Sequence, residues 1–323
     1  MDLIKPARLY AGDTIATVSP CNGWAGDQDH AWKYNRGKQC LESLYKLNAQ
    51  PAPNSMRGSE FLSKNPQARA EDIMWAFENK DIKAVIANVG GNDSIKLLPY
   101  IDTATIKNNP KIFIGMSDVM NINILCLKAG LSTFYGPNLF SETDSYSQNW
   151  FRKTLFDTSV IETIYPRDTG HELVQGQGIV RGKLIGGHTG ITWLENEPIA
   201  LATADFDGSI LFVEDIPEFF SPSHVRDFLL WLAKKDFLHR INGIIIGKLG
   251  GDTSFANHKA VIQNTIGNEC GLKDLPVLYG LNFGHILSSF ILPYGAKAEI
   301  NCEAKTFSIL ESGVTDGSRA PCH

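Results

Sequence analysis

One short stretch of the sequence places a serine where a nucleophile can be activated. It runs from Lys111 to Asn123 and reads Lys-Ile-Phe-Ile-Gly-Met-Ser-Asp-Val-Met-Asn-Ile-Asn. The apolar run before Gly115 predicts a buried strand, the glycine allows a sharp bend, and the apolar residues that follow recur at helical spacing. Ser117 would then present its hydroxyl at the start of a helix, where backbone NH groups and the helix dipole favour developing negative charge.

The same stretch has a simpler interpretation. Serine and aspartate are preferred N-cap residues, so Ser117 or Asp118 could serve only to satisfy the first turn of the helix. The motif also has Val119 where a Gly-x-Ser-x-Gly elbow has its second glycine. A catalytic role for the serine therefore requires a base and an orienting acid from elsewhere in the chain.

Candidate acids follow a strongly apolar segment in the second half. The strand expected over 209–213 leads into Glu214 and Asp215, with Glu218 close behind. Strand alternation places Glu214 on the same face as Phe212, at the C-terminal end of a buried strand, where open α/β sheets gather their ligands. Glu214 is thus a candidate orienting acid, while a capping or salt-bridging role, and competition from the two other carboxylates, stay open.

His285 is the strongest candidate base among eight histidines. It follows Gly284 and precedes an apolar segment, and its nearest rival is His188, which follows a pair of glycines. No two histidines have the spacing of a metal-binding pair, and the six cysteines include no C-x-x-C motif, so the sequence predicts neither a metal site nor a disulfide framework.

Two glycine clusters could contact a substrate through their backbone. Gly90 and Gly91 follow an expected strand and could offer NH groups to an oxyanion, although a plain strand-to-helix turn explains them equally well. The segment Gly247 to Gly251 lacks the spacing of a phosphate-binding loop, so nucleoside triphosphate binding is not expected.

Alternating strands and helices must position these residues. In the first half, strands are expected over 13–20, 84–87 and 112–114, and helices over about 30–47 and 68–79. In the second half, a glycine-rich strand-like segment over 182–192 is followed by strands over 209–213 and 241–246, with a helix over 223–234 and short strands after 276. This order predicts an α/β protein with an N-terminal parallel-sheet, Rossmann-like domain and a C-terminal mixed α/β domain with a β-rich core.

Chain length favours two domains, because single cores rarely grow beyond roughly 250 to 300 residues and the chain has 323. The predicted limits are 1–145 for the N-terminal domain, 146–178 for a polar linker and 179–323 for the C-terminal domain.

Composition narrows the range of partners. The sequence has 43% hydrophobic residues, a formal net charge of -5 and no cluster of Lys and Arg that could follow a phosphate backbone, which argues against nucleic acid. The first ten residues hold no apolar core of signal-peptide length and no later segment is long enough to span a bilayer, so a cytosolic protein without a membrane partner is expected.

The combination of motifs resembles the LD-carboxypeptidase family of serine peptidases, which includes muramoyltetrapeptide carboxypeptidases. Within the family the chain looks most similar to the branch of microcin C immunity proteins. The resemblance extends over nearly the whole chain. In the first half it includes Lys5-Pro6, Gly12-Asp13-Thr14-Ile15, Ser19-Pro20, Gly90-Gly91-Asn92-Asp93-Ser94, Leu97-Leu98-Pro99, Gly115-Met116-Ser117-Asp118 and Tyr135-Gly136-Pro137. In the second half it includes Gly182-Lys183-Leu184-Ile185-Gly186-Gly187, Leu211-Phe212-Val213-Glu214-Asp215, Gly284-His285 and Leu292-Pro293-Tyr294-Gly295.

The resemblance implies a catalytic triad of Ser117, Glu214 and His285, with the nucleophile on the N-terminal domain and the acid and base on the C-terminal domain. It further implies that backbone amides around Gly90, Gly91 and Asp118 stabilise the oxyanion, that no cofactor or metal is used, and that the protein is a homodimer.

Substrate choice stays open. The microcin-immunity branch carries a tryptophan-bearing loop between its domains, whereas the segment Ile161 to Gly178 contains no tryptophan and the nearest one is Trp150. The prediction is a serine-type carboxypeptidase acting on muropeptides. A hydrolase of peptidyl or aminoacyl nucleotides and a noncatalytic ligand-binding protein are the alternatives.

Overall fold

The protein divides into two compact units. The structure, a computed structural model, describes residues 3–167, 171–248 and 255–317. Of these, unit 1 comprises 3–142, 148–159 and 312–317, and unit 2 comprises 143–147, 160–167, 171–248 and 255–311. The division falls within helix α6 (Ser145–Leu155), so this one helix contributes residues to both units.

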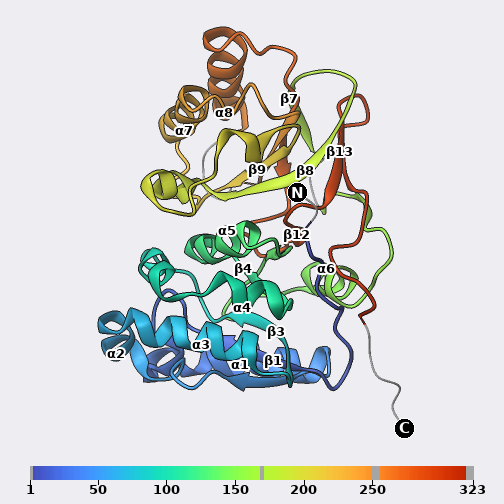
Figure 1. The fold of residues 1–323 in the computed structure, drawn as a ribbon. Helices are drawn as coiled ribbons and strands as arrows, with labels where there is room; N and C mark the ends of the chain where they lie inside the picture. The colour runs from blue at the N-terminus through green and yellow to red at the C-terminus, as the bar shows by residue number, and fades with distance from the viewer. Residues whose placement is uncertain (1–2, 168–170, 249–254, 318–323) are drawn as a thin grey trace. The chain divides into compact units, whose positions relative to one another are not determined.

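Unit 1 is built on a parallel sheet, drawn in blue to green in Figure 1. Its strands lie in the order β2-β1-β3-β4-β5, and all these pairs are parallel. Their bounds are β1 Thr14–Val18, β2 Asn48–Pro51, β3 Ile82–Ala87, β4 Ile112–Gly115 and β5 Phe134–Tyr135. Every residue of β4 is buried, as the apolar run before Ser117 predicted.

Helices cover this sheet and connect its strands. They are α1 Ala31–Leu44, α2 Gly58–Lys64, α3 Pro66–Glu78, α4 Thr103–Asn108 and α5 Met120–Lys128, with 3-10 turns η1 Trp24–Gly26, η2 Gln28–His30, η3 Ser94–Tyr100 and η4 Ser117–Val119. In α5 nearly every side chain is buried, because this helix packs against β4 and against η3. The short turn η4 and then α5 follow β4 directly, so the predicted strand, turn and helix around Ser117 are present.

Unit 2 contains a mixed sheet, drawn in yellow to red in Figure 1. Its strand order is β6-β14-β13-β8-β9-β10-β11-β7. The bounds are β6 Glu162–Ile164, β7 Glu172–Gln175, β8 Ile179–His188, β9 Ile210–Glu214, β10 Gly243–Gly247, β11 Val277–Leu281, β13 Lys297–Asn301 and β14 Thr306–Ile309, with the short strand β12 at Leu292–Pro293. Strands β8 to β11 run parallel, and the flanking pairs are antiparallel. The predicted mixed α/β class with a β-rich second half is therefore confirmed.

The helical segments of unit 2 are η5 Thr189–Asn196, η6 Thr203–Phe206, α7 Pro222–Lys234, α8 Phe255–Ile262 and the π-helical turn η7 Gln263–Glu269. Helix α7 buries Val225, Phe228, Leu229 and Leu232, the apolar face expected from their spacing. None of the helices in the described ranges combines the length and the apolar character needed to cross a bilayer.

The segment expected to be a linker, 146–178, contains regular structure. Most of α6 and all of β6 and β7 lie within it, and its residues 168–170 fall outside the described part of the chain. The domain limits at 145 and 179 stay a prediction.

Candidate active-site residues in the two units

Ser117 lies in a turn with an unusual backbone. Its φ angle is +64°, in the left-handed region that non-glycine residues rarely adopt, and 7% of its surface is exposed. The bend falls on the serine itself rather than on Gly115. Gly115 is required for a different reason, since a Cβ atom there would lie 2.5 Å from Cγ1 of Val119. The turn thus holds the candidate nucleophile in a strained conformation.

Side chains from the following segments hold this turn in place. The backbone NH of Ser117 donates to the hydroxyl of Tyr135 at 3.2 Å, and the NH of Met116 donates to Oδ1 of Asn138 at 3.1 Å. Asn123 donates through Nδ2 to the carbonyl of Gly115 at 3.0 Å. Sequence reasoning assigned no role to these three side chains, although Tyr135 belongs to one of the motifs that carry the family resemblance.

The paired glycines pass close to the serine. A Cβ atom on Gly90 would lie 2.9 Å from Cβ and 3.1 Å from Oγ of Ser117, and one on Gly91 would lie 2.7 Å from Cβ of Cys21. Asn22 donates through Nδ2 to the carbonyl of Gly90 at 2.6 Å. Only glycines therefore allow this loop to pass so close to Ser117 at position 90 and to Cys21 at position 91.

Glu214 and His285 form a close pair in unit 2. Glu214 ends β9, and its Oε2 atom lies 2.7 Å from Nδ1 of His285 and accepts the backbone NH of the same residue at 3.0 Å. The carboxylate is buried, with 2% of its side chain exposed, and the imidazole is 20% exposed. Because Nδ1 donates to the carboxylate, the lone pair of the neutral ring lies on Nε2, which is the arrangement that a general base needs.

Glycines make this pair possible. Gly284 has a φ angle of +90°, and a Cβ atom there would lie 2.2 Å from Oε2 of Glu214. A Cβ atom on Gly247, at the end of β10, would lie 2.9 Å from Cβ of Glu214. Any larger residue at either position would therefore displace the carboxylate.

Charge sets the protonation of His285. Burial lowers the pKa of the imidazole, but the negative charge and hydrogen bond of Glu214, followed by the charges of Asp215 and Glu218, outweigh burial and raise the pKa above its usual value. The same carboxylate adds to the effect of burial in raising the pKa of the Tyr294 hydroxyl well above its usual value. The pKa of His285 is therefore raised overall, and the imidazole acts as a base only in its unprotonated form.

A second histidine–carboxylate pair lies beside the first. His188 ends β8 in register with Glu214, its Nε2 lies 2.7 Å from Oδ1 of Asp215, and its Nδ1 accepts the NH of Gly190 at 2.9 Å. The rings of His188 and His285 meet edge to face, with centroids 5.8 Å apart. Nδ1 of His188 is thus hydrogen-bonded within the protein, whereas Nε2 lies at ion-pair distance from Asp215 without forming a hydrogen bond.

Further polar groups surround Asp215. Thr189 donates its hydroxyl to Oδ2, and Nε2 of His224 lies 3.2 Å from the same oxygen. Burial raises the pKa of Asp215, but His188, followed by the hydroxyl of Thr189 and the backbone NH of Ile216, outweighs burial and lowers the pKa overall. Asp215 is therefore a buried anion with its own partners, distinct from Glu214.

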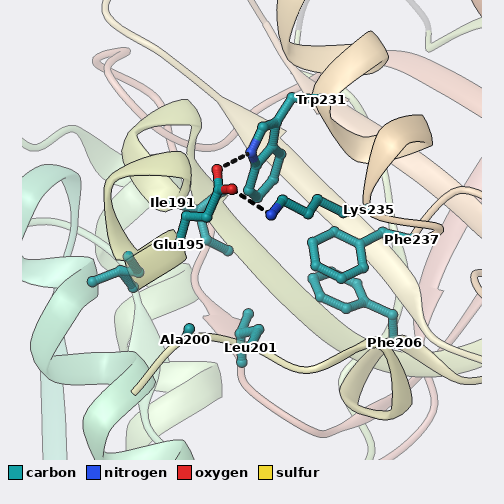
Figure 2. A pocket seen from close by; sticks show the side chains of 9 residues that line it. Ile191, Glu195, Ala200, Leu201, Phe206, Trp231, Lys235 and Phe237 are labelled. Atoms are coloured by element: carbon teal, nitrogen blue, oxygen red, sulfur yellow. Dashed lines mark hydrogen bonds and ion pairs between the residues drawn. The ribbon is translucent and has the colours of Figure 1, made fainter. Parts of the chain in front are cut away.

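A cavity elsewhere in unit 2 is too small to be the substrate site. Figure 2 shows it between η5 and α7, with Glu195 bonded to the indole NH of Trp231 at 2.8 Å and paired with Lys235. Its volume is about 50 Å³, whereas ligand pockets typically measure about 300 to 1,000 Å³. Phe206 and Phe237 stack in its wall.

The described residues contain no cluster of three or more histidine, cysteine, aspartate or glutamate side chains arranged to hold a metal ion. Of the glycine-rich segment Gly247 to Gly251, the structure describes Gly247 and Lys248, and 249–251 lie outside the described residues.

The predicted residues thus form two groups, each assembled within its own unit. Ser117, Gly90, Gly91 and Asp118 lie together in unit 1, and Glu214 and His285 lie together in unit 2.

Comparison with known proteins places the chain in a family. The family model for the LD-carboxypeptidase N-terminal domain matches residues 15–136, and the model for the LD-carboxypeptidase C-terminal domain matches residues 181–300. A probable murein peptide carboxypeptidase of Bacillus subtilis is 28% identical over 327 residues, covering 97% of this chain and 96% of the relative. The microcin C7 self-immunity protein MccF of Escherichia coli is 29% identical over 340 residues, covering 94% and 95%.

Solved structures agree with this assignment. The crystal structure of an MccF-like protein from Streptococcus pneumoniae in complex with AMP has a TM-score of 0.82 and 26% identity, and the match covers 92% of this chain and 98% of that one. The protein is therefore a hydrolase of the serine-peptidase class. It belongs to the LD-carboxypeptidase family, and the relatives that it matches are named as carboxypeptidases and as the self-immunity protein MccF.

Proposed function

We propose that the protein is a serine-type LD-carboxypeptidase that removes the C-terminal residue of a muropeptide in cell-wall recycling, with Ser117 as nucleophile, His285 as general base and Glu214 as the acid that orients it. The observation that carries this proposal is the 2.7 Å contact between Glu214 and Nδ1 of His285, which leaves Nε2 as the proton acceptor. The strained, almost buried Ser117 beside a glycine loop supplies a matching nucleophile.

The reaction would proceed through an acyl-enzyme. Nε2 of His285 takes the proton of the Ser117 hydroxyl as Oγ attacks the carbonyl carbon, and Glu214 stabilises the imidazolium that forms. Backbone amides of the Gly90–Gly91 loop and of Asp118 would donate to the oxyanion, each donor being worth roughly 3 to 4 kcal/mol in the transition state. His285 then gives its proton to the leaving amine, and water releases the acyl group by the same steps. This route uses no metal or cofactor.

One observation favours a second substrate class. Trp193 is 52% exposed, and its ring centroid lies 6.0 Å from that of His188, next to the proposed base. An exposed tryptophan can stack on a flat aromatic group such as a nucleobase. The alternative is therefore a hydrolase that cleaves the amide of peptidyl or aminoacyl nucleotides.

Parallel assays would separate the two substrates. We would incubate the protein with a disaccharide tetrapeptide and, separately, with aspartyl sulfamoyl adenosine, and measure released D-alanine and released sulfamoyl adenosine. Turnover of the tetrapeptide with at least about 10⁴-fold loss in Ser117→Ala is the expected result. Turnover of the nucleotide alone would replace the first substrate with the second.

A noncatalytic ligand-binding protein is the alternative from another class. A fluorophosphonate probe followed by intact-mass measurement tests it, because covalent labelling of the wild type that is absent in Ser117→Ala requires an activated serine. Unchanged turnover in Ser117→Ala would refute the serine mechanism. The homodimer, the cytosolic location and the limits of the two domains remain part of the proposal.

A further inference from the structure

The side chain of Asp118 does not cap its own helix. No side-chain cap bond is formed at the start of η4 or of α5. Oδ2 of Asp118 instead accepts the backbone NH groups of Asp93 at 2.9 Å and of Ser94 at 2.8 Å, at the beginning of η3. The carboxylate therefore connects the turn that carries Ser117 with the end of the loop that begins at Gly90.

This connection is reinforced on both sides. The hydroxyl of Ser94 donates to the backbone carbonyl of Asp118 at 2.7 Å. Nδ2 of Asn121 donates to Oδ1 of Asp118 at 3.0 Å and to the hydroxyl of Ser94 at 2.9 Å. Asp118 is 3% exposed, so its negative charge depends on these donors rather than on water.

A second layer holds the same end of the loop. Arg69, 1% exposed, pairs through both terminal nitrogens with the Asp93 carboxylate, at 2.7 Å and 3.2 Å, and also donates to the carbonyl of Cys21 at 2.8 Å. Burial, and then the charge of Asp118, raise the pKa of the Cys21 thiol well above its usual value. The Gly90–Ser94 loop is thus connected to the turn of Ser117 by an ion pair and by hydrogen bonds that are almost entirely buried.

These bonds bear directly on catalysis if the chain is a serine hydrolase. Gly90 lies against Cβ of Ser117, so a shift of the loop would move the oxyanion donors relative to Oγ. The left-handed backbone of Ser117 costs roughly 1 to 2 kcal/mol and persists only where its surroundings enforce it. One buried carboxylate contacts both the strained turn and the loop.

We propose that Asp118 is a positioning residue whose buried carboxylate fastens the Gly90–Ser94 loop to the turn of Ser117 and thereby aligns the oxyanion donors with the nucleophile. This inference rests on the proposed hydrolase function. It assigns to the side chain a role separate from that of the Asp118 backbone amide.

The test compares Asp118→Asn with Asp102→Asn. Asp102 also accepts two backbone NH groups, from Ala104 and Thr105, but it caps α4 and is exposed. With the disaccharide tetrapeptide as substrate, Asp118→Asn should lower kcat by about 10- to 100-fold with KM changed by less than about threefold. Asp102→Asn should leave Tm nearly unchanged, because asparagine caps a helix about as well as aspartate, and should keep kcat and KM within about twofold, so it controls for the Asp-to-Asn change itself.

Amide hydrogen exchange provides an independent readout. The NH groups of Asp93 and Ser94 should exchange faster in Asp118→Asn and at the wild-type rate in Asp102→Asn. Wild-type kcat in a folded Asp118→Asn protein whose two amides exchange faster would overturn the positioning role. If Asp118→Asn does not fold, Ser94→Ala decides, since it removes one bond to Asp118 and should lower kcat by about fivefold.

The outcomes for the two proposals differ. Absence of both turnover and fluorophosphonate labelling in the wild type would refute the hydrolase function, and the positioning role with it. Turnover in the wild type with undiminished kcat in Asp118→Asn would refute the positioning role alone.

Discussion

The surroundings of Ser117 in unit 1 and of His285 in unit 2, the proposed nucleophile and base, are held by different kinds of interaction. Around Ser117 the backbone is strained and is held by buried hydrogen bonds from Tyr135, Asn138 and the Asp118 group. Around His285 the backbone strain falls on a glycine, and the decisive contacts are between charged groups.

This difference indicates which property of the enzyme each region affects. Hydrogen bonds to backbone groups fix positions, so changes in the first region should alter geometry and the alignment of reacting atoms. Charges near an imidazole change its pKa, so changes in the second region should alter the pH range of activity. The predictions that follow test this contrast, beginning with the largest expected effect.

The strongest test replaces the carboxylate that contacts His285. Glu214→Gln should lower kcat by about 10³- to 10⁴-fold, because the amide does not enforce the same tautomer or stabilise the imidazolium. Steady-state kinetics on the tetrapeptide measure this. Glu218→Gln serves as the control, since this exposed residue affects His285 only through its distant charge, and kcat at pH 8 should stay within about threefold. Equal losses in the two variants would contradict the assignment of Glu214.

The next test distinguishes the effect of backbone strain at Gly284 from the effect of a steric clash with Glu214. Gly284→Ala should lower kcat by about 100-fold, because the new Cβ would lie 2.2 Å from Oε2 of Glu214. Gly280→Ala is a matched control: its φ angle is +87°, close to the +90° of Gly284, but no atom lies within 4 Å of the added Cβ. Both variants should lose roughly 1 kcal/mol of stability, measured by urea unfolding, and only the first should lose activity. Comparable kcat values would show that the clash is relieved without moving the carboxylate.

A smaller effect is expected from the strain in unit 1. Ser117→Gly and Ser117→Ala should both be inactive, but the glycine variant should be more stable by about 1 kcal/mol, because glycine adopts a φ angle of +64° without penalty. At Ser43, an exposed residue of α1, the order should reverse, since glycine is about 0.8 to 1 kcal/mol worse than alanine in a helix. The same order at both positions in denaturant unfolding would argue against stored strain.

The smallest effect concerns the pH profile. His285 must be unprotonated to act as a base, so its raised pKa places the acidic limb of kcat/KM above the pH expected for an ordinary histidine. Asp215→Asn removes one of the charges that raise this pKa, and the limb should move to lower pH, by less than in Glu214→Gln, because Glu214 is the larger cause. Rates measured between about pH 5 and 9 decide the point. A limb that stays or moves upward would show that Asp215 does not act on His285.

Much of the fold could be predicted because its periodic elements are long and apolar. The spacing of the apolar residues in α7 predicts a helix with one buried face, and the short apolar runs of β9 and β10 predict buried strands. Strand β2 was missed, since Asn48–Pro51 contains a single buried residue and lies at the edge of its sheet. Short edge strands such as β2 and β7 owe their conformation to the neighbouring strand rather than to their own residues.

The candidate site was predictable by residue type but not by contact. A turn, a strand end and a glycine made Ser117, Glu214 and His285 candidates, and only the family resemblance singled them out together. The structure places two of them in hydrogen-bonding contact. The fastening role inferred for Asp118 could not be foreseen, because its partners lie 24 and 25 residues earlier in the sequence. A local sequence pattern can predict that an aspartate caps the helix that follows it, but the Asp118 carboxylate binds the backbone of Asp93 and Ser94 instead.

The sequence by itself determined the α/β class, the turn that carries Ser117, the strand end at Glu214 and the family, because these depend on local periodicity and on motifs in fixed order. Only the tertiary structure decided which nitrogen of His285 meets Glu214, why Gly284 must lack a side chain and which backbone groups Asp118 binds. Such contacts join residues far apart in the chain, and their energies depend on burial and distance, which no local pattern encodes.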